Sequence, residues 1–312
     1  MTRVARSSAT RRRAVVTGGA GFIGGHLVER LQADGTDVLI VDDLSTGSVA
    51  NVGDTRIVQL DIARDPLDAT MRSWRPDVVF HLAAQASVPR SIKDPDRDLA
   101  VNVVGTHRVA AAALAAGAGR LVFISSGGAI YGDTERNATE RTPPAPTSYY
   151  GVHKLAAEGH VRLAGLPWST LRPSNVYGPR QSPGLEGAVV AAFLDQARAG
   201  GPLHIHGDGL QTRDFLHVTD LVDAVVLVGR PDSASGTWNV ASGRAISILD
   251  LATHVEREIG RPLGREFGPA RPGDVRRSAI SARRLRALGW RRATTLSDGI
   301  AGLVAATLSG DD

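Results

Sequence analysis

Two side chains that could move a proton together stand four residues apart, Tyr150 and Lys154 in the segment YGVHK. On a helix, residues at i and i+4 share one face, so the phenol and the ammonium would lie close together. A free tyrosine has a pKa near 10, too high for a base at neutral pH, and a neighbouring cation lowers that pKa. The pair therefore predicts a tyrosine acid/base. Ser125 and Ser126, about 25 residues earlier, add hydroxyls that could bind the same substrate oxygen.

A glycine-rich turn precedes this pair by about 130 residues. Gly18, Gly21 and Gly24 form GxxGxxG between an apolar strand at 13–17 and a helical pattern at 22–34. A pyrophosphate can approach such a turn closely because no Cβ atoms intervene, and the helix aims its first amides at the phosphates. The strand before and the helix after predict a dinucleotide site.

The second apolar segment ends in Asp42 and Asp43, about 20 residues after the glycine turn. A carboxylate there accepts hydrogen bonds from ribose hydroxyls and repels a 2′-phosphate. Since no Lys or Arg lies within 42–50, the sequence favours NAD over NADP. In the alternative interpretation, Asp42 only caps a turn. Asp61, after the third strand, is a further candidate, for the adenine amino group.

Short apolar runs alternate with helical patterns in the first part of the chain, which predicts an α/β fold with a doubly wound parallel sheet. We expect a cofactor domain over 13–178 and a mainly substrate-binding domain over 179–312. Parts of 213–240 are expected to return to the first domain, and 1–12 is expected to be a disordered basic tail. The expected strands are 13–17, 37–41, 56–60, 77–82, 120–125 and 168–173, and the expected helices include 22–34, 97–116, 148–164, 187–199, 219–229, 247–259 and 281–288.

Composition narrows the class of protein. The 312 residues include no cysteine, which excludes disulfides and thiolate catalysis and is compatible with a cytoplasmic enzyme. The net charge is only +4, so charge does not indicate a nucleic-acid partner. No apolar run is long enough to span a membrane, and the histidines lack metal-ligand spacing, so we expect neither a membrane partner nor a metal.

Taken together, these motifs resemble the extended short-chain dehydrogenase/reductase family of NAD-dependent epimerases and dehydratases, most closely its UDP-glucose 4-epimerase branch. The resemblance covers about 13 to 290. It is carried by TGGAGFIG (17–24), VDDLSTG (41–47), HLAAQASV (81–88), SSGGAIYGD (125–133), YGVHK (150–154), LRPSNVYGPRQ (171–181), GDGLQTRDFLHVTD (207–220) and RPGD (271–274).

The resemblance implies that the chain inverts C4 of a UDP-hexose through a 4-keto sugar, with Tyr150 as acid/base at O4 and Lys154 as its tuning partner. A serine at 125 or 126 would bind the same oxygen. For the substrate it implies Asn175, Arg213 and Arg271 at the diphosphate, with Ser126 at the sugar and His206 stacked on the uracil. For NAD it implies contacts from Gly18, Gly21, Phe22, Ile23, Gly24, Asp42, Asp43, Asp61, Ile62, Leu82, Ala83, Ala84, Asn102, Tyr150 and Lys154.

One departure from the family pattern leaves the catalytic hydroxyl open. If the usual spacing to the Tyr-Gly pair is kept, Gly127 occupies the position and no hydroxyl is present. If one residue is inserted, Ser126 occupies it, and we favour that alignment. The family's 4,6-dehydratases carry Asp-Glu where this chain has Gly128 and its neighbours, which argues against a dehydratase.

Further expectations concern alternative functions, substrate breadth and assembly. A UDP-glucuronate 4-epimerase, with Arg180 near the carboxylate, and a non-catalytic NAD(H) sensor stay open as alternatives. Counting seven residues from Arg271 gives Ser278, whose small side chain would leave room for an N-acetyl group, so UDP-GlcNAc and UDP-GalNAc are candidate substrates. By resemblance, the helices at 97–116 and 148–164 form a homodimer contact.

Overall fold

The computed structural model describes residues 11–184, 187–271 and 274–309. Most of the expected basic tail, residues 1–10, lies outside the described residues, as do Pro272 and Gly273 of the RPGD segment. Within the described part, no helix is both long enough and apolar enough to cross a bilayer.

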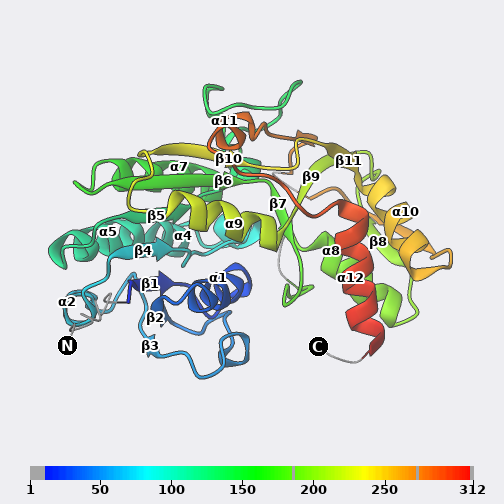
Figure 1. Ribbon diagram of the computed structural model, residues 1–312. Helices are drawn as coiled ribbons and strands as arrows, with labels where there is room; N and C mark the ends of the chain where they lie inside the picture. The colour runs from blue at the N-terminus through cyan, green and yellow to red at the C-terminus, as the bar shows by residue number, and fades with distance from the viewer. Residues whose placement is uncertain (1–10, 185–186, 272–273, 310–312) are drawn as a thin grey trace.

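Seven parallel strands form the central sheet (Figure 1), in the order β10-β6-β5-β4-β1-β2-β3. This confirms the expected α/β fold and all six expected strands to within one or two residues. All of these strands except β3 are almost wholly buried, and β1, β2, β4 and β5 have the Val, Ile and Leu content expected of strands covered on both faces. Their bounds are β1 Arg13–Thr17, β2 Asp37–Asp42, β3 Ile57–Gln59, β4 Val78–His81, β5 Leu121–Ile124, β6 Trp168–Pro173 and β10 Gly236–Val240.

Helices cover both faces of this sheet, each through its own apolar cluster. On one face pack α1 (Phe22–Ala33), α9 (Val218–Val228) and α11 (Arg283–Ala287). On the other pack α2 (Asp68–Trp74), α5 (Thr106–Ala115) and α7 (Tyr149–Arg162). The doubly wound arrangement places the carboxyl ends of the parallel strands along one edge, where such folds bind their ligands.

The helix expected over 97–116 is interrupted. The chain runs through α4 (Pro95–Leu99), a π-helix η2 (Ala100–Gly105) and then α5. The wider turn buries Asn102, whose side chain is 1% exposed. π-Bulges of this kind recur near functional sites. The apolar periodicity of this segment gave no sign of the bulge.

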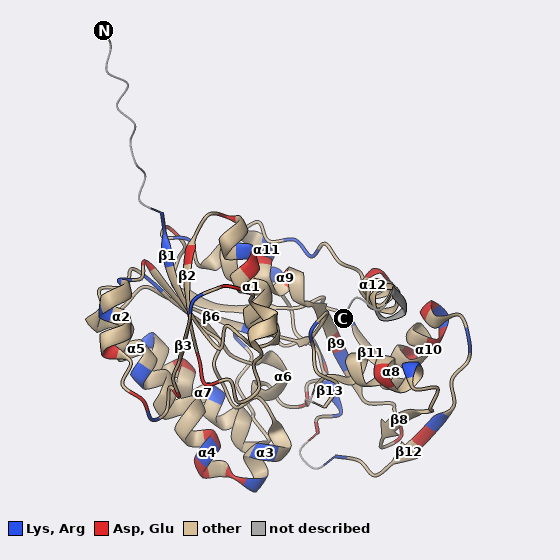
Figure 2. Ribbon diagram, turned by 90° about the horizontal axis from the view of Figure 1, so that it is seen from below, with Lys and Arg blue, Asp and Glu red and all other residues tan. Residues whose placement is uncertain are grey.

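A smaller group of elements gathers beside the carboxyl edge of the large sheet (Figure 2). Strands β11, β9, β13 and β7 form one small sheet, β8 and β12 another, and α8, α10 and α12 pack on them around a separate apolar cluster. The bounds are β7 Asn175–Tyr177, α8 Val189–Arg198, β8 Leu203–His206, β9 Thr212–His217, β11 Ala245–Ser247, α10 Ile248–Ile259, β12 Arg265–Gly268, β13 Arg277–Ser278 and α12 Leu296–Ser309.

The chain passes repeatedly between the two parts. After β9 in the small sheet it forms α9 against α1, then β10 at the edge of the large sheet beside β6. Three short elements complete the fold near the site: α3 (Val88–Lys93), α6 (Gly127–Ile130) and the 3₁₀-helix η1 (Val49–Asn51).

Candidate active site

A first cavity opens at the glycine turn and has a volume of about 490 Å³. Gly18 has φ +69°, a left-handed conformation that favours glycine. A Cβ on Gly24 would lie 2.1 Å from the Gly18 carbonyl oxygen, so α1 can approach the turn only because residue 24 has no side chain. Since the turn leads directly into the N-terminus of α1, the residues present fit a dinucleotide pyrophosphate.

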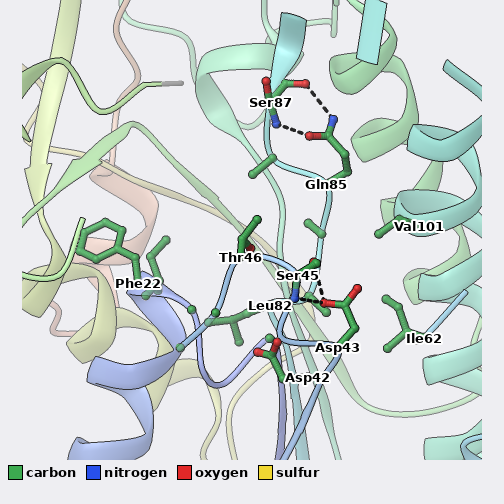
Figure 3. A pocket seen from close by; sticks show the side chains of 18 of the residues that line it. Phe22, Asp42, Asp43, Ser45, Thr46, Ile62, Leu82, Gln85, Ser87 and Val101 are labelled. Carbon is green, nitrogen blue, oxygen red and sulfur yellow. Dashed lines mark hydrogen bonds between the residues drawn. The ribbon is translucent and has the colours of Figure 1, made fainter. Parts of the chain in front are cut away.

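Asp42 and Asp43 project into this cavity from the end of β2 (Figure 3). Asp42 Oδ2 accepts from the Ala20 amide at 2.9 Å and its Oδ1 accepts from the Leu44 amide at 2.9 Å. Burial raises the pKa of Asp42. Asp42 can therefore cap the turn and bind the ribose at the same time, because each of its carboxylate oxygens keeps a second lone pair for a ribose hydroxyl.

All but one of the side chains expected only at the dinucleotide line this first cavity, and Asn102 is the exception. The lining includes Gly18, Gly21, Phe22, Ile23, Gly24, Asp42, Asp43, Asp61, Ile62, Leu82, Ala83 and Ala84. Asn102 lines neither cavity, because its amide is held inside the protein. Its Nδ2 donates to the Gln85 carbonyl (2.9 Å) and to Asp98 (3.0 Å), and its Oδ1 accepts from the Gln85 amide. Asn102 therefore shapes the cavity wall through the Gln85 segment.

The second cavity, about 420 Å³, adjoins the first and is lined by Tyr150, Lys154, Ser125 and Ser126. Helix α7 presents Tyr150 and Lys154 to it together, in keeping with their i, i+4 spacing. Ser148 caps α7 by accepting from the Gly151 amide at 3.2 Å, which fixes the helix start just before the tyrosine. The structure thus brings the expected proton-transfer residues to one cavity.

Lys154 lines the second cavity although the residue is only 2% exposed. Its Nζ donates to the Ile124 carbonyl at 2.6 Å and lies 4.3 Å from the centre of the Phe123 ring. Burial lowers the pKa of Lys154 to about 7, although the charges of Glu158 and Asp98 raise it. The carbonyl bond uses one of three donors and leaves two for ligand hydroxyls and the phenol.

This burial predicts a pH dependence of stability. An unfolded chain keeps the Lys154 proton up to about pH 10.4, whereas the folded chain loses it near pH 7, so in between the unfolded state binds more protons. The free energy of unfolding should therefore rise from pH 7 toward pH 9 by up to roughly 1.4 kcal/mol per pH unit. Denaturant titrations of wild type and Lys154→Met test this: the rise should be weaker in the variant, and parallel curves would refute it.

The two serines have separate environments. Ser125 Oγ donates to Glu158 Oε1 at 2.6 Å in the interior. Ser126 Oγ accepts from the Ala129 amide at 3.3 Å as the N-cap of α6, and its donor hydrogen remains for a ligand. A Cβ on Gly127 would lie 2.5 Å from Ile280 Cδ1 and 3.0 Å from the Pro173 carbonyl oxygen, so a side chain at position 127 would be crowded. Ser126 is therefore the better placed hydroxyl.

Ser125 belongs to a buried network that the sequence did not reveal. Arg172 donates from Nε to Glu158 Oε1 (2.8 Å) and from Nη2 to Oε2 (2.6 Å), and from Nη1 to the Tyr131 hydroxyl (2.7 Å). The Tyr131 hydroxyl donates to Asn239 Oδ1 at 2.9 Å. Although burial opposes the charged form, the bonds to Glu158 raise the pKa of Arg172. The network ties α7 to β6 and β10 directly behind the second cavity.

The expected substrate residues Asn175, His206, Arg213 and Arg271 all line the second cavity. Arg213 is buried, and its Nη2 is paired with Asp274, with Nη1 donating to the Thr212 carbonyl at 2.9 Å. A diphosphate bound by Arg213 would therefore contact a guanidinium that also pairs with the Asp274 carboxylate. Arg271 is exposed at the cavity rim.

Two residues near the site have roles that the sequence analysis did not predict. Asp98 is fully buried and accepts from His153 Nδ1 (2.6 Å) and Gln85 Nε2 (2.6 Å), which links the middle of YGVHK to the cavity wall. Gln181 lines both cavities. The motif YGPRQ includes Gln181, but residue type alone did not distinguish it from a surface amide.

Comparisons with known proteins agree with this geometry. The model of the NAD dependent epimerase/dehydratase family matches residues 14–241. A UDP-glucose 4-epimerase of Mycolicibacterium smegmatis is 43% identical over 301 residues, covering 93% of this chain and 96% of that one. The Thermus thermophilus UDP-glucose 4-epimerase, solved in complex with NAD, has a TM-score of 0.91 and 37% identity, covering 95% of this chain and 99% of that one.

A second solved structure, the Thermotoga maritima UDP-glucose 4-epimerase with UDP-glucose, has a TM-score of 0.90 and 34% identity, covering 96% of this chain and all of that one. Similarity of this extent, over both the cofactor and the substrate cavity, confirms the expected family. The chain belongs to the NAD-dependent epimerase/dehydratase family.

Proposed function

We propose that the chain is an NAD-dependent UDP-hexose 4-epimerase that interconverts UDP-glucose and UDP-galactose. One observation carries the proposal: the cavity at the glycine turn adjoins the cavity that holds Tyr150, Lys154 and Ser126. A cofactor in the first and a sugar in the second would then meet at the wall between them. Accordingly, residues 13–178 with α9 and β10 would bind the cofactor, and most of the rest the nucleotide sugar.

In this reaction the residues of the chain transfer the proton of the sugar O4 and hold that oxygen in position. Bound NAD would supply the redox chemistry of the reaction, the reversible removal of a hydride from C4 of the sugar. Tyr150 takes the proton of the O4 hydroxyl on its phenolate oxygen and gives it back at the end. The Lys154 ammonium stabilises that phenolate, and Ser126 donates a hydrogen bond to the same O4.

Substrate is held at its other end by charge. Arg213 and Arg271 would bind the diphosphate, because a guanidinium matches phosphate oxygens in a bidentate geometry, with Asn175 adding an amide donor. Held only at the nucleotide, the 4-keto sugar is free to turn over between the two hydride transfers. His206 at the end of β8 lines the second cavity and would stack on the uracil ring.

The direct test is a panel of UDP-sugars incubated with the purified protein, with products identified by NMR. We expect UDP-glucose and UDP-galactose to interconvert without added oxidant and without net NADH. Absorbance near 340 nm should show at most a small bound reduced fraction. Binding of NAD without any sugar product would instead favour the sensor alternative.

Substrate breadth depends on Ser278, which is buried in β13 and lines the second cavity. Its hydroxyl would lie 3.7 Å from a Cβ at Gly128, so two small residues face each other there. This supports acceptance of a 2-acetamido group. We expect UDP-GlcNAc and UDP-GalNAc to interconvert as well; complete inactivity on both would exclude the wider specificity.

The glucuronate alternative loses its proposed contact. Arg180 lines neither cavity; its Nη2 pairs with Glu29 at 2.5 Å and its Nη1 donates to the Asn51 carbonyl at 3.1 Å. A UDP-glucuronate substrate would need another cation at its carboxylate. The Gly127-Gly128 pair likewise supplies no acid for a 4,6-dehydratase.

We further propose a homodimer through α5 and α7. Val104 in η2, Leu114 in α5, Val152 in α7 and Leu163 just after α7 are 45%, 48%, 47% and 79% exposed, on elements that pack against one another. A second copy could cover these side chains as a four-helix contact. Light scattering at micromolar concentration should give a dimer for wild type and a shift toward monomer for Leu114→Glu. The control Leu210→Glu changes an equally exposed leucine (54%) outside these helices and should stay dimeric. A monomeric wild type would overturn the proposal.

A further inference from the structure

The wall between the two cavities is almost entirely apolar. The residues that line both cavities are Ile23, Leu82, Ala84, Ala86, Ile124, Val176 and Gln181. Gln181 is thus the one residue with a polar side chain in the shared wall of these cavities. A polar group buried in an apolar wall costs free energy unless it is hydrogen-bonded.

One half of the Gln181 amide is satisfied by the protein. Its Nε2 donates to the Val176 carbonyl at 2.9 Å. A carbonyl can only accept, so this bond also fixes which amide atom is nitrogen and which is oxygen. Arg180, with φ +65°, forms the tight turn that brings Gln181 back over β7.

The other half of the amide is not satisfied. Gln181 Oε1 is buried and has no hydrogen-bond partner among the described residues. A buried acceptor without a donor costs free energy that a ligand donor would recover. The site therefore calls for an N–H or O–H group delivered at the junction of the two cavities.

We infer that Gln181 Oε1 accepts a hydrogen bond from the carboxamide N–H of the nicotinamide ring. This rests on the proposed NAD site. The apolar shared wall suits a flat aromatic ring, and the carboxamide is the ring's one donor group. A sugar hydroxyl is the other possible donor, but the polar groups arranged for the sugar, Tyr150 and Ser126, lie outside the shared wall.

Such a bond would fix how the ring is turned about its glycosidic bond. The carboxamide marks one edge of the ring, so holding that edge selects which ring face is presented to the second cavity. Gln181 would then be a specificity-determining cofactor ligand, deciding the face that exchanges the hydride with the sugar.

The test compares NAD with 3-acetylpyridine adenine dinucleotide, in which a methyl group replaces the carboxamide NH₂. Dissociation constants are measured by calorimetry on nucleotide-free protein, for wild type and Gln181→Met. We expect the preference of wild type for NAD over the analogue to fall about tenfold in the variant, chiefly through weaker NAD binding. Taking the ratio of the two ligands cancels any general loss of affinity.

A matched control is Gln211→Met. Gln211 also donates to a main-chain carbonyl, that of His206 at 2.7 Å, but it lines the second cavity alone. Its preference for NAD over the analogue should equal that of wild type. If Gln181→Met does not fold, Gln181→Leu, which also removes the acceptor oxygen, takes its place, and the same fall in preference is expected.

The outcomes separate the two proposals. An unchanged preference in folded Gln181→Met, with NAD still binding, would overturn the inference and leave the epimerase proposal standing. If instead only UDP-sugar affinity falls, the donor is a sugar hydroxyl and the carboxamide assignment is wrong. Failure of wild type to bind NAD would overturn both.

Discussion

Tyr150→Phe is expected to lower the epimerisation rate by about 10²- to 10⁴-fold, the usual contribution of a positioned acid/base. The phenyl ring fills the same space on α7 but cannot take the O4 proton. Because the ring remains and the glycine turn is untouched, NAD affinity and folding should change little. The measurement is the initial rate of UDP-galactose conversion, with NAD affinity determined by calorimetry on the same preparations.

The neighbouring tyrosine gives a matched control. Tyr149 is 51% exposed, and its ring is tilted by 31° against the His153 ring, with ring centres 6.2 Å apart. Tyr149→Phe should keep nearly the full rate. Should both variants lose activity to the same degree, the effect would lie in the packing of α7, and the role assigned to the Tyr150 hydroxyl would have to be abandoned.

Glu158→Gln is expected to destabilise the protein by about 3–5 kcal/mol, the typical result of removing one partner from a buried ion pair. The Arg172 cation would stay in the interior without a countercharge, and the hydroxyl of Ser125 would lose a charged acceptor. Urea unfolding of wild type and variant at neutral pH measures the difference.

An exposed ion pair is the control here. Glu29 pairs with Arg180 at the surface, with side chains 52% and 30% exposed, and such pairs contribute about 0–1 kcal/mol. Glu29→Gln should therefore shift the urea midpoint only slightly. Equal shifts in the two variants would mean that the Glu158 network adds no more to stability than a surface contact.

Much of the large sheet could be predicted from the sequence because most of its strands, such as β2 and β5, are buried and rich in Val, Ile and Leu. The strand at 236–240 was harder to predict, since GTWNV mixes polar and apolar residues at an edge. Its place beside β6 depends on a pairing between segments far apart in the chain, which local patterns do not encode.

Some residues of the candidate site could likewise be predicted from the sequence, and others could not. Residues in motifs, such as Gly18 and Tyr150, could be assigned because spacing fixes their geometry relative to a turn or a helix. Side chains whose role depends on what lies opposite could not. Asn102 was expected at the cofactor but bonds Gln85, and Gln181 was overlooked because its unsatisfied oxygen exists only in the folded cavity wall.

The position of β10 determines where the chain can be truncated without disrupting the large sheet. A fragment that stops near residue 178 would leave β6 as an unprotected edge and would strip the α9 layer from one face, exposing the apolar side chains that Leu221 and Val225 now cover. Unpaired edges and bare apolar faces promote aggregation. The dinucleotide-binding half is therefore not a separable module, and efforts to express or transplant it alone should retain the chain through at least residue 240.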